Sequence, residues 1–137
     1  MLIIIGTYFI RRQLKKTTPI LPVDLLKIPI FAGCTIELWP GRVPIVPQAL
    51  ELARDGIIPA GAYRNLEFAG PEVETAGTFP QAVLDCLYDP QTSGGLLLAI
   101  AEERGAELLR RLADAGVTAA AVGRVRPRGP RRIVLKP

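Results

Sequence analysis

The stretch that decides the fold is residues 96–135, which read LLLAIAEERGAELLRRLADAGVTAAAVGRVRPRGPRRIVL. It opens with the continuous apolar run 96–100, which is typical of a strand covered on both faces. Acidic residues, a stripe of leucines and then arginines follow over 102–115, and this order predicts an amphipathic helix whose charges suit its two ends. Gly116 is the residue at which we expect that helix to end.

Two further strands are predicted after this helix. Residues 119–125 and 131–135 have the apolar and β-branched composition of strands. The Pro- and Gly-containing residues 126–130 between them suit the turn of a hairpin. The resulting order of strand, helix, strand, strand predicts an α+β fold, with helices packed on a mixed, largely antiparallel sheet.

The first half of the chain carries signals for shorter elements. The β-branched and aromatic composition of residues 2–10 predicts a strand, and residues 35–39 predict a second one that ends in a turn at Pro40 and Gly41. An apolar face over 48–55, with proline before it and glycine after it, predicts a helix.

The segment between that helix and residue 96 is harder to assign. Residues 57–77 are rich in Gly, Pro and Glu and predict a long irregular connection. Thr78 and Gln81 have the spacing of a capping box, which would open a helix that runs to about Tyr88.

Composition excludes several classes of active site. The chain has 137 residues, 49% of them hydrophobic, which is typical of one domain with a buried core. It has no histidine, so Ser-His and Cys-His nucleophile pairs and histidine-bearing zinc sites are excluded. Its two cysteines, Cys34 and Cys86, cannot form a four-thiolate metal site, and we expect two thiols in preference to a disulfide.

The sequence gives no indication of a membrane protein. The longest apolar run, residues 2–10, has nine residues, whereas a membrane-spanning helix needs roughly 20. Basic residues follow this run, whereas a secretory signal has them first. We therefore expect a cytoplasmic protein with no membrane partner.

The end of the chain is strongly basic. Residues 115–137 hold six basic residues and no acidic one: Arg124, Arg126, Arg128, Arg131, Arg132 and Lys136. Such a tail suits nucleic-acid phosphates. However, arginines 124 and 126 alternate with valines as on the solvated face of a strand, and no aromatic residue is interleaved to stack on a base. We favour the solvated sheet face over nucleic-acid binding.

The loop at 89–95, Asp-Pro-Gln-Thr-Ser-Gly-Gly, is the first candidate binding site. Its glycines let a ligand approach the main chain, and its hydroxyls and successive N–H groups suit a phosphate; a tight structural turn is the alternative. The residues concerned are Gln91, Thr92, Ser93, Gly94 and Gly95. Arg64 and Asn65 are a second candidate, as an anion contact or as residues that stabilise their loop. Asp85 and Asp89 are expected to be solvated carboxylates.

The heptapeptide 89–95, followed by Leu-Leu-Leu-Ala, resembles the C-terminal domain of selenophosphate synthetase, also called selenide, water dikinase. Further segments resemble the same domain in the same order: Arg42-Val43-Pro44, residues 49–53, Gly56-Ile57, Pro59-Ala60-Gly61, Arg64-Asn65 and residues 121–125. The resemblance covers about residues 35–135 and implies the α+β fold of the C-terminal domain of aminoimidazole ribonucleotide synthetase-type enzymes.

The resemblance also implies a chemistry. In that family ATP, selenide and water give selenophosphate, AMP and phosphate, with Mg²⁺ on the nucleotide phosphates. The family's N-terminal half supplies the nucleotide site, the reactive Cys or selenocysteine and most magnesium-binding aspartates, and no segment of this chain matches that half. The resemblance therefore implies no catalytic or metal-binding residue in this chain, and no tight binding of ATP or Mg²⁺ to it alone.

The expected organisation has two parts. Residues 1–32 match nothing in the family and are expected to form an atypical lead segment, while residues 33–137 form the family-like domain. We expect a truncated or fragmentary selenophosphate synthetase that is inactive alone, with an N-terminal half as partner. The alternative is a non-enzymatic interaction module that forms a homodimer through an exposed lead strand over residues 2–10.

Overall fold

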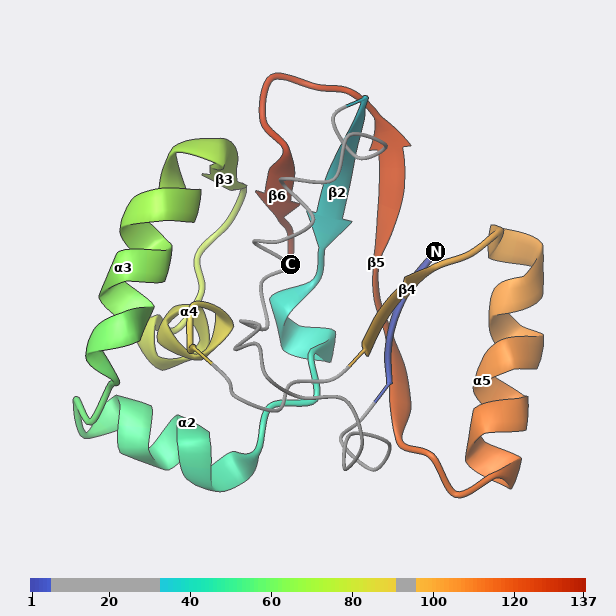
Figure 1. Ribbon diagram of the computed structural model, residues 1–137, viewed down its shortest axis with the longest axis horizontal. Coiled ribbons are helices and arrows are strands. Elements are labelled where there is room, and N and C mark those ends of the chain that lie inside the picture. Colours follow the sequence, from blue (N-terminus) through green and yellow to red (C-terminus); the bar gives the residue numbers. More distant parts are fainter. Residues whose placement is uncertain (6–32, 91–95) are drawn as a thin grey trace.

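The computed structural model describes residues 1–5, 33–90 and 96–137 of the chain. They form a six-stranded mixed sheet with helices beside it, which confirms the predicted α+β fold (Figure 1). The strand order across the sheet is β3-β6-β2-β5-β1-β4. The strands are β1 Leu2–Ile5, β2 Cys34–Leu38, β3 Val73–Thr75, β4 Leu96–Ala99, β5 Ala119–Pro127 and β6 Ile133–Leu135.

The helices lie in two groups. Three of them lie beside the β3 end of the sheet and α5 lies beside the β4 end (Figure 1). The longer helices are α2 Pro47–Arg54, α3 Ala60–Ala69, α4 Gln81–Leu87 and α5 Gly105–Asp114, and the short 3₁₀ turns are η3 Pro40–Arg42, η4 Gly70–Glu72 and η5 Glu102–Arg104. Helices α2 and α5 confirm the predictions, and each is followed by a glycine with positive φ, 77° at Gly56 and 70° at Gly116. No helix in the described ranges is long and apolar enough to span a bilayer.

The core lies between the sheet and helices α3 and α4, which contribute Ala62, Ala69 and Leu87 to it. Ile36 is paired with Ile133 and Leu38 with Leu135 in the parallel β2–β6 ladder, so all four side chains share one face. They are at most 4% exposed and cluster with the fully buried Leu87. Because successive residues of a strand alternate in direction, residues 35 and 37 of β2 lie on the opposite face.

The predicted hairpin of the last two strands is wrong. Strand β2 lies between β5 and β6, antiparallel to the first and parallel to the second. The turn-prone residues 126–130 suit a hairpin locally, but β2 is buried over residues 35–38 and must pair the backbone groups of both its edges. The two last strands satisfy those edges separately.

Strand β4 is confirmed, but its predicted cover on both faces is wrong. It is the last strand of the sheet order, and its Leu96 is 57% exposed. A short apolar run predicts a strand without saying where in a sheet that strand lies. Strand β1, and not β4, lies in the interior of the sheet, between β5 and β4.

Strand β1 confirms the lead strand over residues 2–5; residues 6–10 of that prediction lie outside the described part. It pairs antiparallel with β4 on one side and with β5 on the other. Both of its edges are therefore occupied by the same chain, and the expected exposed lead strand is corrected. The boundary at residue 32 and the homodimer stay predictions.

The predicted irregular connection over 57–77 is wrong, because α3, η4 and β3 occupy most of it. Gly61 suggests a loop, yet it stands inside α3 where Pro90 packs closely. A Cβ at Gly61 would lie 2.6 Å from Cγ of Pro90. The buried Ala62 and Ala69 are seven residues apart, which puts them on one face of this helix.

The predicted capping box is also wrong, although the helix is present. Helix α4 begins at Gln81, its N-cap is Pro80, and no side chain caps it. The residue before a proline is disfavoured in the helical conformation, so Phe79 cannot be the first helical residue that a cap at Thr78 requires. Nε2 of Gln81 instead donates to Oδ1 of Asp85 at 2.8 Å.

Candidate functional site

The candidate loop leaves helix α4 from a fixed point. Residues 91–95, which contain all five predicted phosphate-facing positions, lie outside the described ranges. At the root of the loop, Nδ2 of Asn65 donates to the carbonyl oxygen of Tyr88 at 2.8 Å, and Pro90 packs on Gly61. Tyr88 is itself buried in the core. Helix α3 thus fixes where the loop begins.

The two residues of the second candidate have separate surroundings. Nδ2 of Asn65 donates to the Tyr88 carbonyl oxygen, a contact of the kind that a stabilising residue makes, and Asn65 as an anion contact stays a prediction. Arg64 is exposed on the next position of the same helix. Arg64 as an anion contact stays a prediction.

The thiol beside the loop root does not suit nucleophilic chemistry. Cys86 is buried on α4, and burial, followed by the negative charges of Asp89 and Asp85, raises the pKa of its thiol. A raised pKa keeps the thiol protonated at neutral pH. Cys34 and Cys86 are not joined in a disulfide, as expected. Both aspartates are half-buried rather than fully solvated.

The strongest electrostatic feature of the described residues is one that the sequence analysis missed. Glu37 of β2 is only 4% exposed. Its Oε2 accepts from Nε of Arg124 at 2.5 Å, and its Oε1 accepts from Nη1 of Arg126 at 2.7 Å and pairs with Nζ of Lys136 at 2.8 Å. We call these four residues the Glu37 cluster. From the sequence, arginines 124 and 126 are expected on a solvated sheet face, with nucleic-acid binding as the less favoured alternative.

The Glu37 carboxylate is held in its charged form. The hydrogen bond from Lys136, together with those from Arg126 and Arg124, lowers the pKa of Glu37 from 4.5 to about 2, although burial acts to raise it. The cluster joins side chains of β2 and β5 with the residue that follows β6. Residue 37 is paired with residue 124 of β5 on one side and with residue 134 of β6 on the other. The signal for this cluster in the sequence is Glu37 itself, an acidic residue between the apolar Ile36 and Leu38 of a predicted strand.

A second set of contacts holds the connection into β6 beside this cluster. Oγ1 of Thr35 accepts from the Gly129 N–H at 2.8 Å and donates to the Arg131 carbonyl oxygen at 2.7 Å. Glu72 pairs with Arg132 at 3.5 Å and with Arg128 at 3.8 Å. The basic tail is therefore folded against two acids of the same chain.

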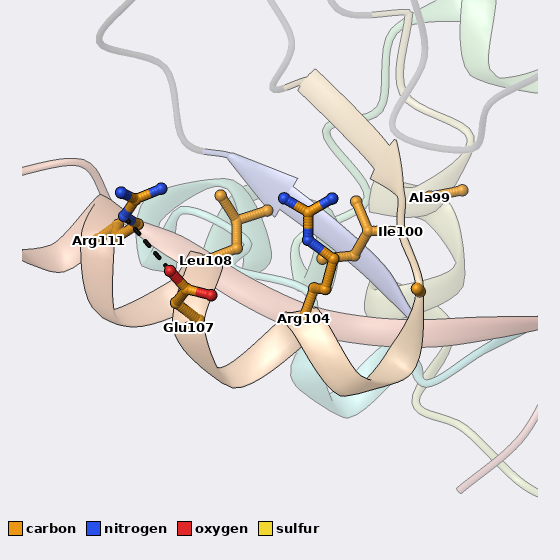
Figure 2. A pocket seen from close by; sticks show the side chains of 7 residues that line it. Ala99, Ile100, Arg104, Glu107, Leu108 and Arg111 are labelled. Carbon is orange, nitrogen blue, oxygen red and sulfur yellow. Dashed lines mark ion pairs between the residues drawn. The ribbon is translucent and has the colours of Figure 1, made fainter.

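A separate cleft lies between β4 and α5 (Figure 2). Its volume is about 410 Å³, and it is lined by Ala99, Ile100, Ala101, Arg104, Glu107, Leu108 and Arg111. Figure 2 shows Arg104 beside Ile100, while Arg111 lies further along α5 and pairs with Glu107 at 3.7 Å. The Glu107 and Arg111 side chains are mostly exposed. This cleft has room for a small ligand, and three of its seven lining residues are charged, of which Glu107 and Arg111 pair with each other.

The described residues do not fit a magnesium site. Over residues 1–5, 33–90 and 96–137 there is no group of three or more acidic or cysteine side chains that could hold a metal ion. Mg²⁺ prefers several oxygen ligands around it, with carboxylates among them. No step of the chemistry is therefore assigned to a metal bound by these residues.

Taken together, the described residues define an α+β domain in which helix α3 holds the point where the 89–95 segment begins. Comparison with curated proteins identifies its relatives. The chain is 42% identical over 102 residues to a protein of Clostridioides difficile (strain 630) named "Selenide, water dikinase", a match that covers 74% of this chain and 29% of that protein.

Other relatives carry the same name. Identity is 41% over 105 residues with "Selenide, water dikinase 2" of Peptoclostridium acidaminophilum, covering 76% of this chain and 30% of that protein. It is 40% over 98 residues with the enzyme of Pelobacter propionicus, covering 72% and 28%. No protein-family model matches the chain.

These similarities confirm the recognition made from the motifs: over about three quarters of its length, the chain is related to the selenide, water dikinases. It spans about 30% of the length of these relatives, which is consistent with the single C-terminal domain that the motifs indicate.

Proposed function

We propose that this chain supplies an accessory, phosphate-facing domain for the selenide, water dikinase reaction, in which ATP, selenide and water give selenophosphate, AMP and phosphate. The observation that carries the proposal is the 42% identity over 102 residues with a selenide, water dikinase. The fixed loop root at Asn65 and Tyr88 supports it, because a phosphate-binding loop must be held in place to act.

In this proposal the loop makes contacts and does no bond chemistry. The hydroxyl groups of Thr92 and Ser93 and the backbone N–H groups of Gly94 and Gly95 donate to phosphate oxygens. Phosphoryl transfer also needs metal ions and cations around the phosphates, and a partner half carries them. The chain alone is accordingly proposed to be inactive.

Calorimetry tests the accessory role. We expect no saturable, micromolar binding when Mg²⁺ and ATP are titrated into the purified chain, because the described residues hold no magnesium site. Tight binding of Mg²⁺ and ATP to the chain, or selenophosphate made by it unaided and detected by ³¹P NMR, would overturn the proposal.

A domain exchange tests the loop. The full chain, with its β1 strand, replaces the matching segment of the Clostridioides difficile enzyme, and selenide-dependent AMP formation is measured. We expect Thr92→Ala with Ser93→Ala to lower kcat/KM by about tenfold or more, as loss of transition-state hydrogen bonds does. The matched control is Thr78→Ala, an exposed threonine outside the loop, which is expected to leave the rate unchanged. Equal rates for both variants would contradict the role of the loop.

The assay also shows whether the loop root matters. Asn65→Ala removes the hydrogen bond to the Tyr88 carbonyl and is expected to lower kcat/KM in the exchanged enzyme, whereas Glu67→Ala, at an exposed position of the same helix, is not. If both variants keep the full rate, the loop does not depend on helix α3. The homodimer stays a separate proposal, which light scattering of the chain tests.

A further inference from the structure

We propose that the Glu37 cluster is a binding site for a small phosphate-bearing anion, such as inorganic phosphate, pyrophosphate or a phosphate monoester. The cluster brings three cationic groups onto one carboxylate: Nε of Arg124, Nη1 of Arg126 and Nζ of Lys136 all lie within 2.8 Å of a Glu37 oxygen. A single carboxylate neutralises one of them. Two positive charges remain, and a second anion would relieve their mutual repulsion.

The Glu37 carboxylate is buried, whereas the three cationic side chains that bind it are reached by solvent. The Glu37 side chain is 5% exposed, whereas those of Arg124, Arg126 and Lys136 are 48%, 49% and 37% exposed. A guanidinium has five N–H donors, and each arginine contacts Glu37 through one nitrogen. Donors suited to phosphate therefore remain in side chains that solvent reaches.

The cations are also fixed before a ligand arrives. Arg124 and Arg126 stand on the paired strand β5, opposite residues 37 and 35, and Lys136 directly follows β6 with its N–H donated to the Leu38 carbonyl oxygen. The ionised Glu37 holds their charged ends together. Preorganised donors lose less conformational entropy on binding than free surface arginines do.

The cluster offers contacts for a phosphate but no stacking surface for nucleic acid. Arg128 and Arg132 of the basic tail pair with Glu72, and Glu74 of β3 is in register with residues 134 and 37, so the excess positive charge on this face comes from the three cations of the cluster itself. None of the cluster residues is aromatic, and the nearby Trp39 ring is covered by Arg42, whose Cζ lies 4.6 Å from the ring centroid. Bases would find no stacking partner in the cluster, so the shared chemistry is the phosphate group itself.

This site does not depend on the proposed function. It lies on the face of the sheet opposite the Ile36 and Leu38 side chains, which pack with Leu87 and Tyr88 at the root of the 89–95 loop. No residue of that loop takes part in it. If the domain-exchange assay gives a negative result, the proposed anion site at the Glu37 cluster is not affected. If the cluster binds no phosphate, the proposed accessory role of the 89–95 loop is not affected.

The test is a titration of the full chain with inorganic phosphate and with pyrophosphate, followed by NMR of the arginine Nε–H groups and by calorimetry at low salt. We expect saturable binding and a shift of the Arg124 and Arg126 signals. Arg126→Gln and Lys136→Gln should each weaken binding by about tenfold, the effect of one lost charge-assisted hydrogen bond. The matched control Arg110→Gln removes the same charge from an exposed pair on α5 and should leave binding within about twofold.

Several outcomes would overturn the proposal. They are the absence of saturation, an equal loss of affinity in Arg110→Gln, or binding of a thymidine oligonucleotide without binding of either small phosphate. Circular dichroism of each variant shows whether it is folded. If Arg126→Gln is unfolded, the Lys136→Gln variant and the wild-type NMR shifts still decide the result.

Discussion

Glu37 takes part in three of the ion pairs that the described residues form, with two partners on β5 and one directly after β6. A buried carboxylate is costly unless its oxygens are paired, and here both oxygens are. Removing its charge leaves three cations facing one another around a neutral amide. Stability should therefore depend on this residue and on pH.

We predict that Glu37→Gln lowers the free energy of unfolding at neutral pH by about 2 kcal/mol, a moderate value because the cations are half-exposed and screened by water. The folded pKa of about 2 lies below the ordinary 4.5, so the stabilisation is present above pH 4.5 and is lost as the pH falls towards about 2. Urea unfolding over this range should show the wild type converging on the variant.

The control for this prediction is Glu107→Gln, which removes an exposed acid from an i,i+4 pair on α5. Its effect should stay within about 0.5 kcal/mol. If the difference in free energy of unfolding between the wild type and the Glu37→Gln variant stays constant from pH 4.5 downwards, the ionised Glu37 does not stabilise the folded state.

At the scale of elements, β5 is the strand that links the two parts of the sheet. It has nine residues and pairs with β2 and with β1, and its register with β1 shifts between Leu2 and Ile3. Gly123 lies at this irregularity. A Cβ there would lie 2.1 Å from the Glu37 carbonyl oxygen, so only glycine fits where the two backbones approach.

We predict that Gly123→Ala destabilises the fold by about 3 kcal/mol, because the added methyl group meets backbone that cannot rotate away. Thermal or urea unfolding measures the loss. Gly41→Ala is the matched control, since a Cβ there has nothing within 4 Å, and it should change stability by less than about 0.5 kcal/mol. Equal stability of the two variants would mean that β5 and β2 can separate at no cost.

The elements differ in how well their residues predicted them. Helices α2 and α5 carry both an apolar face and a terminal glycine, and each was predicted with bounds close to those observed. Helix α3 was missed because Pro59, Gly61 and Gly70 are loop signals in isolation. Only its packing shows that Pro59 is the N-cap and that Gly61 makes room for Pro90.

At the scale of the whole molecule, the two ends of the chain belong to one sheet. Strand β1 contains the second residue and is placed between β5 and β4, while β6 ends two residues before the C-terminus. Met1 also takes part, because its amino group donates to the Ile100 carbonyl oxygen at 3.0 Å. The fold thus depends on the lead strand even though residues 1–32 resemble nothing in the family.

We predict that Ile3→Pro strongly destabilises the whole domain. Ile3 is paired with Leu98 on one side and with Ala121 on the other, so its N–H faces one of two ladders and proline removes that bond. The expected loss is about 3 kcal/mol or more, seen as a lower Tm. Ala101→Pro is the control, because its φ of −57° already suits proline. An Ile3→Pro variant as stable as wild type would show that β1 is dispensable.

Local signals in the sequence determined the α+β class, helices α2, α4 and α5, the strands β1, β2, β4, β5 and β6, and the relation to the selenide, water dikinases. Those signals act between residues that are near neighbours in the chain, such as an apolar face and the glycine after it. The tertiary structure alone decided the strand order, the place of β2 between β5 and β6, and the partners of Glu37, two of which are 87 and 89 residues away. Pairings over such distances depend on which arrangement buries every apolar face and satisfies every backbone group at once, and no local stretch of sequence contains that information.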